Sequence, residues 1–446
     1  MSEHDIGKAL EELSSHLGRG QLLTEEVDRY SYSYDSSGME FMPDAIVRPR
    51  TVDDISLVLE IANKYEVPVT PRGSGTSLVG GPLPVKGGIV LDLQEMNKVI
   101  EIDEGTGVVR VEAGVRVREL NSLIKGRFLP VNPDGIGLST VGGLIAEDAA
   151  SPLSAKYGTM GCHVLGLEVV TPDGRVFSLE QPGPPSRRSA LELILGSEGT
   201  LGIITSALIK LRYRPESRAC YYMELNDVSD SLAIYDAMEK SGVEISGFEV
   251  YHNYKELVEE KESIGVEAVG FLEISGSSDC VERWRSHVSE ILSETALEHK
   301  EIDEAEADRI WERREILYEV SRRRKASIRV ISMLSYPHLL RDLVQEIDRT
   351  SSRMKIPSMT VMNPAMGWVM GVFLFNSKDP REVERTDKAV SNLLEKASDL
   401  GASLGYGVGV GIHRLTEYFD EGYLSLMRMI KQLLDPKGIM NPGKLM

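Results

Sequence analysis

Cysteines are scarce in this chain of 446 residues, and long apolar runs are missing. The three cysteines, Cys162, Cys220 and Cys280, lie far apart and form no C-x-x-C pair. This spacing excludes an iron–sulfur cluster ligated from within the chain and gives no reason to expect disulfides. Because no run of about 18 apolar residues occurs, no transmembrane segment is predicted, and the amino terminus is charged and helix-patterned. We therefore predict a cytoplasmic protein, although peripheral attachment to a membrane complex would leave no such trace.

Basic residues are also fewer than acidic ones. The chain has 50 lysines and arginines against 69 aspartates and glutamates, a formal net charge of −19. Nucleic-acid binding needs a positive field, so no nucleic-acid partner is expected. The basic cluster "RRRK" at 322–325 fits the end of a helix better than a nucleic-acid contact. The length exceeds what one core usually covers, which predicts two domains or three.

Glycine is abundant, and it is concentrated in the stretch "PRGSGTSLVGG" at 71–81, directly after the short β-type run "VPVT". Glycines at this density let a ligand approach the backbone, so that successive N–H groups converge on an anion, usually a phosphate. The two commonest phosphate motifs fail here. A dinucleotide fingerprint needs a third glycine where the chain has Leu78, and a Walker loop needs a lysine where it has Gly81. A plain turn is the alternative.

The rest of the chain has an α/β organisation around this loop. From Thr51 the segment "TVDDISLVLEIANKYEVPVT" predicts a capped helix and then a strand, and "GGIVLDL" a second buried strand. Short strands with glycine-rich turns at 139–150 and 195–205 follow, and three glycine-rich segments suggest one extended ligand. After about 214 the pattern becomes strand, helix, strand, strand, helix, as in a ferredoxin-like unit. The predicted divisions are 1–214, 215–403 and a carboxy-terminal segment, 404–446.

Together these motifs resemble a known family, the FAD-linked oxidases and dehydrogenases of the vanillyl-alcohol oxidase type, particularly its D-lactate dehydrogenase and glycolate oxidase branch. The resemblance covers most of the chain. It implies an α+β fold, with a two-subdomain FAD-binding domain of the PCMH type and a ferredoxin-like antiparallel-sheet cap domain. Its motifs occur in the family's order as "PRGSGTSLVGG", "VNPDGIGLSTVGG", "KYG", "VLGLEVVTPDG", "LGSEGTLGIIT" and "LLDPKGIMNPGKLM".

The resemblance also implies which residues bind the cofactor. The FAD pyrophosphate would be wrapped by Arg72, Gly73, Ser74, Gly75, Thr76, Ser77 and Gly80. The flavin side would be lined by Pro133, Asp134, Thr140, Gly142 and Gly143. Glu198, Ile203 and Ile204 would lie along the adenosine end, and Asn441 would close the site, with helix-end packing as its alternative role. Thr76 stands where relatives with covalent flavin often carry a histidine, so non-covalent FAD is expected.

The substrate side departs from the family. Metal-dependent 2-hydroxy-acid members carry a pattern like H-x-G-D-G-N-x-H, whose histidines hold a divalent metal. The corresponding stretch here is "NPAMGWVM", which puts Asn363 and Met370 at the histidine positions and Met366 at the aspartate. No metal site is expected there. The methionines fit a buried core, or a pocket for a larger and less polar substrate than lactate or glycolate.

The family's usual base is missing too. Its E-H-G-I-G motif reads "GVGVG" at 407–411, with Val408 in place of the histidine. Three residues are candidates for the lost functions. Tyr406 and His413 lie in the same segment, and each has a structural role as its alternative. Arg314 in "RIWERR" matches a family W-x-x-R and would grip a carboxylate bidentately, with a surface salt bridge as its alternative.

Two functions follow from the resemblance. The first is an FAD-dependent dehydrogenase or oxidase that acts on an alcohol or 2-hydroxy acid without metal, by hydride transfer to flavin. The second is a flavin-binding electron-transfer subunit of a glycolate oxidase-like complex, with an electron acceptor or an iron–sulfur protein as its partner. Loss of both histidine motifs favours the second, and the intact FAD motifs favour the first.

Overall fold

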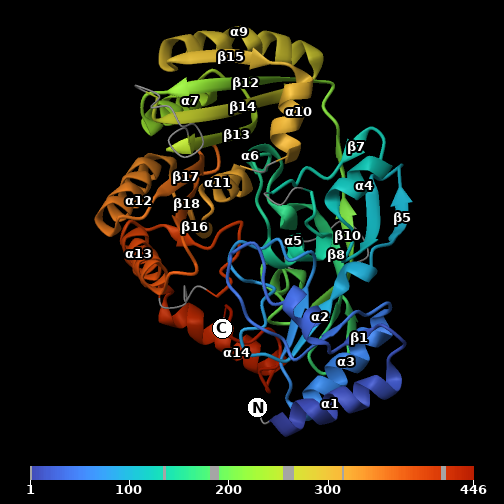
Figure 1. Cartoon of the computed structure of the whole chain (residues 1–446). Helices are drawn as coiled ribbons and strands as arrows, with labels where there is room; N and C mark the ends of the chain where they lie inside the picture. The colour runs from blue at the N-terminus through green and yellow to red at the C-terminus, as the bar shows by residue number, and fades with distance from the viewer. Residues whose placement is uncertain are drawn as a thin grey trace.

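The computed structural model describes residues 3–133, 137–180, 190–254, 266–313, 316–412 and 418–445. Two large hydrophobic cores organise the chain. The first is built from residues between Ala9 and Leu211 together with Ile439 and Met440, and the second from residues between Ala219 and Val410. The predicted boundary at 214 falls between them. Figure 1 shows the first assembly mainly in blue to green and the second from yellow-green to orange-red.

A small sheet at the amino-terminal end carries the glycine loop. Its strands β1 (Leu22–Leu23), β2 (Ala45–Val47), β4 (Ile89–Asp92) and β3 (Val69–Arg72) lie in that order, with β2 and β3 parallel to β4. Helix α3 (Val52–Tyr65) begins at Thr51, whose side chain accepts from the Asp54 N–H in a capping box, as the sequence predicts. Helix α1 (Glu3–His16) packs on α3, and α2 (Glu26–Ser31) lies beside β2.

A five-stranded antiparallel sheet completes the first assembly. Its order is β5 (Val99–Asp103), β6 (Val108–Glu112), β10 (Ile203–Lys210), β8 (Val164–Val170) and β9 (Val176–Ser178). Helices α4 (Val117–Leu123), α5 (Val141–Glu147) and α6 (Ser154–Tyr157) accompany it, and α5 packs on β10. The short strands β7 (Arg127–Phe128) and β11 (Arg212–Tyr213) pair with each other.

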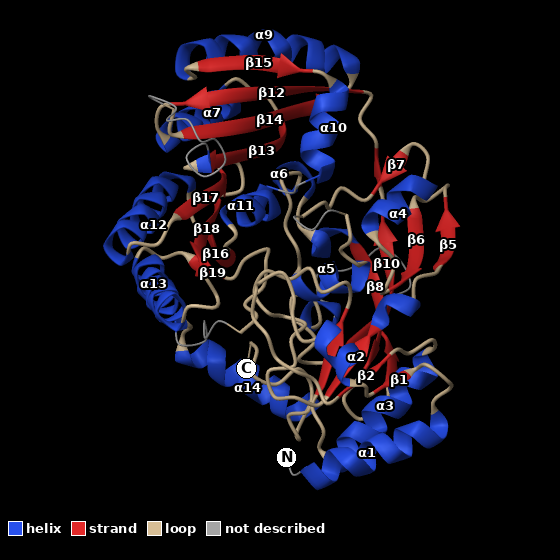
Figure 2. Cartoon of the chain, in the orientation of Figure 1, coloured by secondary structure: helices blue, strands red, loops and turns tan. Residues whose placement is uncertain are grey.

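The second assembly is an eight-stranded antiparallel sheet made of two units with the same topology (Figure 2). The first unit runs β12 (Ser217–Leu225), α7 (Val228–Lys240), β13 (Ile245–His252), β14 (Ala268–Gly276), α9 (Ser278–Thr295) and β15 (Glu298–Ile302). The second runs β16 (Ser327–Leu334), α12 (Leu340–Met354), β17 (Ser358–Asn363), β18 (Trp368–Phe375), α13 (Pro380–Asp399) and β19 (Ser403–Leu404). Helices α10 (Glu304–Arg313) and α11 (Ile316–Arg324) connect them.

Each unit orders its strands in the sheet as fourth, first, third and second, which is the ferredoxin-like arrangement. The predicted ferredoxin-like unit and the α+β class are therefore confirmed, and the sheet contains a second such unit that the sequence does not reveal. The units join where β13 pairs with β17 at Val250 and Met362, Tyr251 and Val361, and His252 and Thr360. We call this junction the seam.

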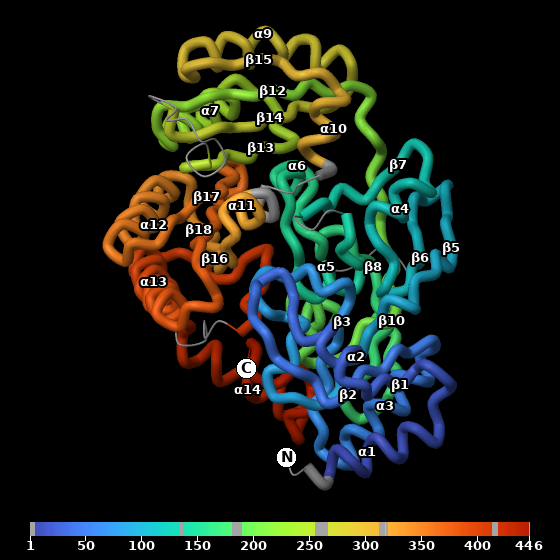
Figure 3. Tube along the Cα trace, in the orientation of Figure 1, coloured from blue at the N-terminus to red at the C-terminus, as the bar shows by residue number. Residues whose placement is uncertain are grey.

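The carboxy-terminal segment leaves the sheet and returns to the first assembly. After β19, helix α14 (Glu421–Leu434) packs Ile430 and Leu434 against the first core. Met440 then forms a parallel bridge with Val69 at the start of β3. Figures 1 and 3 show this red segment running beside the blue amino-terminal elements. Among the helices of the described ranges, none is both long enough and apolar enough to cross a membrane.

Candidate cofactor and substrate site

The glycine loop lies at the carboxyl end of β3, beside an open cavity of about 860 Å³ that we call the cofactor cavity. Ligands collect at such strand ends. All three glycine-rich segments contribute to its wall. Of the predicted cofactor residues, it is lined by Arg72, Gly73, Ser74, Gly75, Thr76, Ser77, Thr140, Gly142, Gly143, Glu198, Ile203 and Ile204.

Unpaired donors line this cavity. Within the described parts of the chain, the backbone N–H groups of residues 73–78 donate to no protein acceptor. The buried guanidinium of Arg72 donates from Nη2 to the Tyr34 carbonyl at 2.9 Å, whereas its Nη1 has no acceptor there. Successive free N–H groups beside a buried cation form an anion site, because buried donors must otherwise be paired. The loop therefore presents donors that suit an anion such as a phosphate group.

Two glycines of the loop are required by close approach. A Cβ on Gly73 would lie 2.3 Å from Oγ1 of Thr140, the residue that caps α5. Gly75 has φ of +71°, and a Cβ there would lie 2.2 Å from Nη2 of Arg72. Both positions exclude a side chain, so the loop can curl tightly over the arginine.

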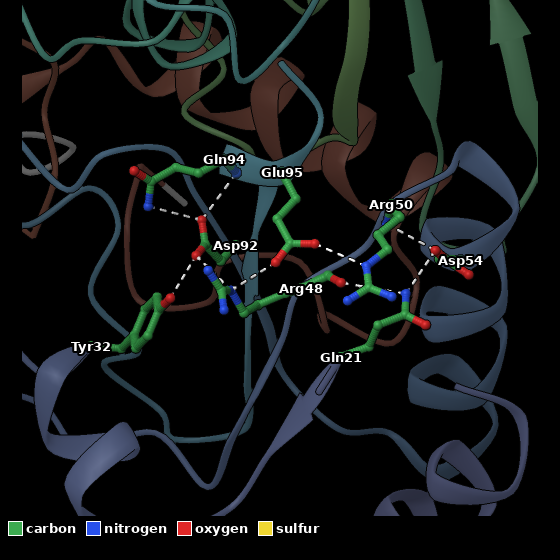
Figure 4. A network of polar contacts seen from close by, with 8 residues as sticks. All are labelled: Gln21, Tyr32, Arg48, Arg50, Asp54, Asp92, Gln94 and Glu95. Carbon is green, nitrogen blue, oxygen red and sulfur yellow. Dashed lines mark hydrogen bonds and ion pairs between the residues drawn. The ribbon is translucent and has the colours of Figure 1, made fainter. Parts of the chain in front are cut away.

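A polar network surrounds Asp92 at the end of β4 (Figure 4). Asp92, which pairs with Arg72 in the sheet, accepts from the Tyr32 hydroxyl at 2.5 Å and from the Gln94 N–H at 3.1 Å. Burial and this hydrogen bond raise the pKa of Tyr32. Glu95 pairs with Arg48 and Arg50, and Gln21 donates to Asp54. The network connects the ends of β2 and β4 with the start of α3. It thereby stabilises the strand end of β4 that pairs with Arg72.

The carboxy-terminal tail is anchored to residues in and beside the cavity wall. Asn441 donates from Nδ2 to the carbonyls of Glu198 at 2.7 Å and Gly81 at 3.2 Å. The Glu198 carboxylate accepts from the N–H groups of Val410 and Gly411. Lys444 donates to the carbonyls of Gly80 and Leu83. Gly80 and Asn441, both predicted for the site, thus act through backbone anchoring and are absent from the described cavity lining.

Two glutamates, Glu147 and Glu198, are in the described lining of this cavity, and Glu147 is the last residue of α5. Burial, and secondly the charge of Glu198, raises the pKa of Glu147 to about 8. Burial also raises the pKa of Glu198, and it lowers that of Lys444 to about 8. Glu147 is therefore mainly protonated at neutral pH, which keeps negative charge low beside the anion site.

A second cavity of about 620 Å³, the apolar cavity, shares Thr76, Ser77, Ser139, Leu144 and Glu147 with the first. Its far wall is the second assembly. Glu249 from β13, Asn363 from β17, and Trp368 and Met370 from β18 line it near the seam. The rest of its described lining is Leu78, Pro133, Ala149, Ala150, Ser151, Pro152, Met366, Gly407 and Val408.

The residues at the family's metal positions take other roles. Asn363 donates to the Pro152 carbonyl at 3.3 Å and accepts from the Met366 N–H at 3.2 Å, so its amide braces the turn after β17. Met366 and Met370 line the apolar cavity, whereas Met359 and Met362 are fully buried core residues. Among the described residues, no group of three histidine, cysteine, aspartate or glutamate side chains is arranged to hold a metal.

The predicted catalytic residues are only partly placed. Arg314, His413 and the predicted flavin-side residue Asp134 lie outside the described residues. Tyr406 is half-buried, and it is not among the described residues lining either cavity. Burial and the nearby Asp148 raise its pKa. Pro133 lines the apolar cavity. The catalytic roles of Arg314, Tyr406 and His413 stay predictions.

Sequence reasoning missed three polar residues of the apolar cavity. Glu249 is the one acidic residue in the otherwise uncharged run "ISGFEV", a signal that could have marked it. It is 1% exposed and accepts from the Tyr251 hydroxyl. Ser151 is 6% exposed, and its Oγ has no hydrogen-bond partner within the described chain. Glu147 lies within the second glycine-rich segment, 139–150, and nothing in "GGLIAED" distinguishes it from a solvated acidic residue.

The cofactor cavity fits FAD. Its unpaired N–H groups and Arg72 suit a pyrophosphate, Ile203 and Ile204 offer apolar surface to a ring system, and the adjoining apolar cavity offers room for a substrate. When bound, FAD would be held by the glycine loop and by the start of α5 at Thr140.

Comparisons with known proteins agree with this site. Residues 43–180 match the family model "FAD binding domain", and residues 214–445 match "FAD linked oxidases, C-terminal domain". The glycolate oxidase subunit GlcD of Bacillus subtilis (strain 168) is 28% identical over 442 residues, which is 94% of this chain and 92% of that protein. A probable mitochondrial D-lactate dehydrogenase of Danio rerio is 29% identical over 430 residues, 91% of this chain and 84% of that protein.

Among solved structures, the 4-ethylphenol oxidase from Gulosibacter chungangensis has a TM-score of 0.82 at 18% identity, covering 100% of this chain and 97% of that one. This likeness establishes the fold, a PCMH-type FAD-binding domain with an antiparallel-sheet cap domain. The second family model alone covers more than half of the sequence. The chain therefore belongs to the FAD-linked oxidases, a family of flavin-dependent oxidoreductases.

Proposed function

We propose that this protein oxidises an alcohol or a 2-hydroxy acid, either lactate- or glycolate-like or larger and less polar, with non-covalent FAD and without metal. The observation that carries the proposal is the shared wall of the two cavities. An anion-binding loop opens into a mostly apolar chamber through Thr76, Ser77, Ser139, Leu144 and Glu147. A cofactor in the first cavity and a substrate in the second would meet at this wall.

Bound FAD supplies the acceptor for a hydride from the substrate carbon. The chain's own residues hold the partners in place. Arg72 and the N–H groups of 73–77 would hold the phosphates of bound FAD, and Ile203 and Ile204 would offer apolar surface to its adenosine end. Trp368 excludes water from the substrate side, and its indole N–H donates to the Ser332 Oγ at 2.7 Å, which fixes the ring.

The non-covalent attachment follows from Thr76. Its hydroxyl hydrogen-bonds with the Ser139 Oγ at 3.2 Å, and a threonine hydroxyl does not offer the nucleophilic nitrogen that histidine offers to a flavin. Acid precipitation of the purified protein should therefore release all flavin into the supernatant. Yellow protein in the washed pellet would contradict this attachment.

The metal-free mechanism follows from Asn363, Met366 and Met370, which stand at the family's metal-ligand positions. An amide already engaged with the backbone and two thioethers are poor ligands for the hard divalent ions that grip a hydroxy acid. We keep Arg314 as the proposed carboxylate ligand, and Tyr406 and His413 as proposed proton-handling residues. Each is tested by substitution with glutamine or phenylalanine and by pH profiles of flavin reduction.

A second candidate function is a partner-dependent flavin subunit. Two observations favour it: the B. subtilis relative is named as a subunit of glycolate oxidase, and the family's histidine motifs are missing. Such a protein would pass electrons to an acceptor or iron–sulfur protein and turn over only in a complex. Co-purification of that partner from the native host supports this function.

Anaerobic absorbance titration of the FAD-loaded protein separates the two functions. The panel contains D- and L-2-hydroxy acids, their amides, and larger alcohols. Bleaching of the flavin band near 450 nm by one compound supports the oxidoreductase and identifies its substrate class. A bound flavin that only dithionite reduces supports the partner-dependent subunit. Failure to bind FAD at all contradicts both.

A further inference from the structure

The wall shared by the two cavities contains one acidic residue among the residues that the structure describes. Both cavities are lined by Thr76, Ser77, Ser139, Leu144 and Glu147. Of these side chains, only the carboxyl group of Glu147 is an acid or base in the usual pH range. A cofactor in the first cavity and a substrate in the second would meet at this wall. Glu147 therefore lies where the reacting hydroxyl group of a substrate would be.

The segment that has lost the family's histidine packs against Glu147. Residues 407–411 stand where the family carries E-H-G-I-G, with Val408 at the histidine position. Gly407 and Val408 line the apolar cavity together with Glu147. A Cβ on Gly409, the next residue, would lie 3.6 Å from Cγ of Glu147. Glu147 is thus a side chain able to accept a proton, placed beside the position from which the histidine is missing.

The surroundings of the carboxyl group suit proton transfer. Ser77 forms a side-chain hydrogen bond with Glu147, and the charged groups that act on Glu147 are two other acids, Glu198 and Asp35. The basic residue Lys444 interacts with these two acids. Burial, and secondly the charge of Glu198, raises the pKa of Glu147 to about 8. A catalytic base works best when its pKa lies near the working pH.

We propose that Glu147 is the catalytic base of this protein: its carboxylate removes the proton from the substrate hydroxyl group as hydride leaves the adjoining carbon. The inference rests on the proposed function, because it takes the apolar cavity as the substrate site. The O–H and C–H bonds break and a C=O bond forms. The proton passes to Glu147, and the two electrons pass with the hydride to FAD. Arg314 keeps its proposed contact with a substrate carboxylate, and Tyr406 and His413 keep proposed roles in passing the proton onward.

Anaerobic stopped-flow measurement of flavin reduction tests the proposal, with the compound that bleaches the flavin in the absorbance titration. At saturating substrate, the wild-type rate constant should rise about tenfold from pH 6 to pH 7 and level off above the pKa of Glu147, because only the ionised carboxyl group accepts the proton. Glu147→Gln should retain FAD, lower the rate constant at pH 8 at least 100-fold and remove the rise with pH. Glu147→Asp should lower the rate constant at least tenfold and retain the rise.

A second readout needs no turnover. The infrared difference spectrum of the FAD-loaded protein between pH 6 and pH 10 should contain the C=O band of a protonated carboxyl group that Glu147→Gln lacks. Glu273→Gln is the matched control, because Glu273 is also a buried glutamate whose pKa is raised by burial. It is absent from the described lining of both cavities. This control should keep both that band and the rise of the rate constant with pH.

The outcomes separate the base from the oxidation itself. A flat wild-type profile between pH 6 and pH 8, a loss of less than 100-fold in Glu147→Gln, or an unchanged infrared band in that variant overturns the assignment of the base while the oxidation stands. If Glu147→Gln fails to fold, the wild-type profile and Glu147→Asp decide, and an undiminished rate in Glu147→Asp overturns the assignment. Failure of every compound to bleach the wild-type flavin contradicts the proposed oxidation, and the base with it.

Discussion

Replacing Glu147 by glutamine should abolish a large part of the pH dependence of folding stability. The pKa of Glu147 is raised from 4.5 to about 8, chiefly by burial. A carboxyl group with a raised pKa in the folded state stabilises the fold below its unfolded pKa, and this contribution is lost as pH rises towards the folded pKa. Each pH unit in this window is worth about 1.4 kcal/mol. Between pH 5 and pH 8 the wild type should therefore lose about 3.5 kcal/mol that the variant does not lose, because titration is incomplete at both ends of this window.

Urea unfolding of the FAD-free protein at pH 5, 6, 7 and 8 measures this difference. The wild-type midpoint should fall relative to that of Glu147→Gln by nearly equal steps per pH unit, because other titrating groups are common to both proteins. The exposed Glu290, on α9, serves as the control, and Glu290→Gln should parallel the wild type. Parallel curves for wild type and Glu147→Gln would falsify the assignment of a buried, protonated carboxyl in the cavity wall.

Three further outcomes follow from the site. Gly75→Ala should weaken the affinity for FAD at least tenfold in a fluorescence titration. The new Cβ would lie 2.2 Å from Nη2 of Arg72, and Gly75 has φ of +71°. Unchanged affinity would show that the loop does not need this glycine. Asn441→Ala should lower the free energy of unfolding by about 2 kcal/mol, because the carbonyls of Glu198 and Gly81 lose their buried donor. An unchanged midpoint in denaturant unfolding would contradict a stabilising role for these two hydrogen bonds. Washing with a chelator should leave flavin reduction by the substrate unchanged, and stoichiometric zinc or manganese whose removal stops reduction would refute the metal-free proposal.

The features that sequence predicted well are local. Thr51 caps its helix and the glycine loop lies at a strand end, because neighbouring residues dictate both. Asn441 depends on contacts far along the chain. The resemblance implies its place near the site, and the structure shows that it donates to the carbonyls of Glu198 and Gly81, which line the cavity, while Asn441 itself is absent from the described lining.

Features that depend on long-range geometry were beyond the sequence. All eight residues of β13 are buried, so alternation of polar and apolar residues could not tell which face of the strand Glu249 occupies. The repeated ferredoxin-like topology is likewise a property of strand order, which no local pattern records. Tyr406 is a candidate for the lost catalytic function because it lies close in sequence to the position of the missing histidine. Distance along the chain does not determine the direction of its side chain.

The contacts between the carboxy-terminal tail and the residues around Gly80 can form only late in synthesis. Asn441 and Lys444 contact carbonyls of Gly81 and Gly80 that precede them by 360 and 364 residues. At ribosomal speeds of about 5–20 residues per second, the loop waits on the order of 20–70 s for these contacts. During that interval the carbonyls of Gly80 and Gly81 lack their contacts with Lys444 and Asn441. Capture of FAD would then be among the last events of biosynthesis, and a cell short of flavin would accumulate chains that are otherwise fully folded.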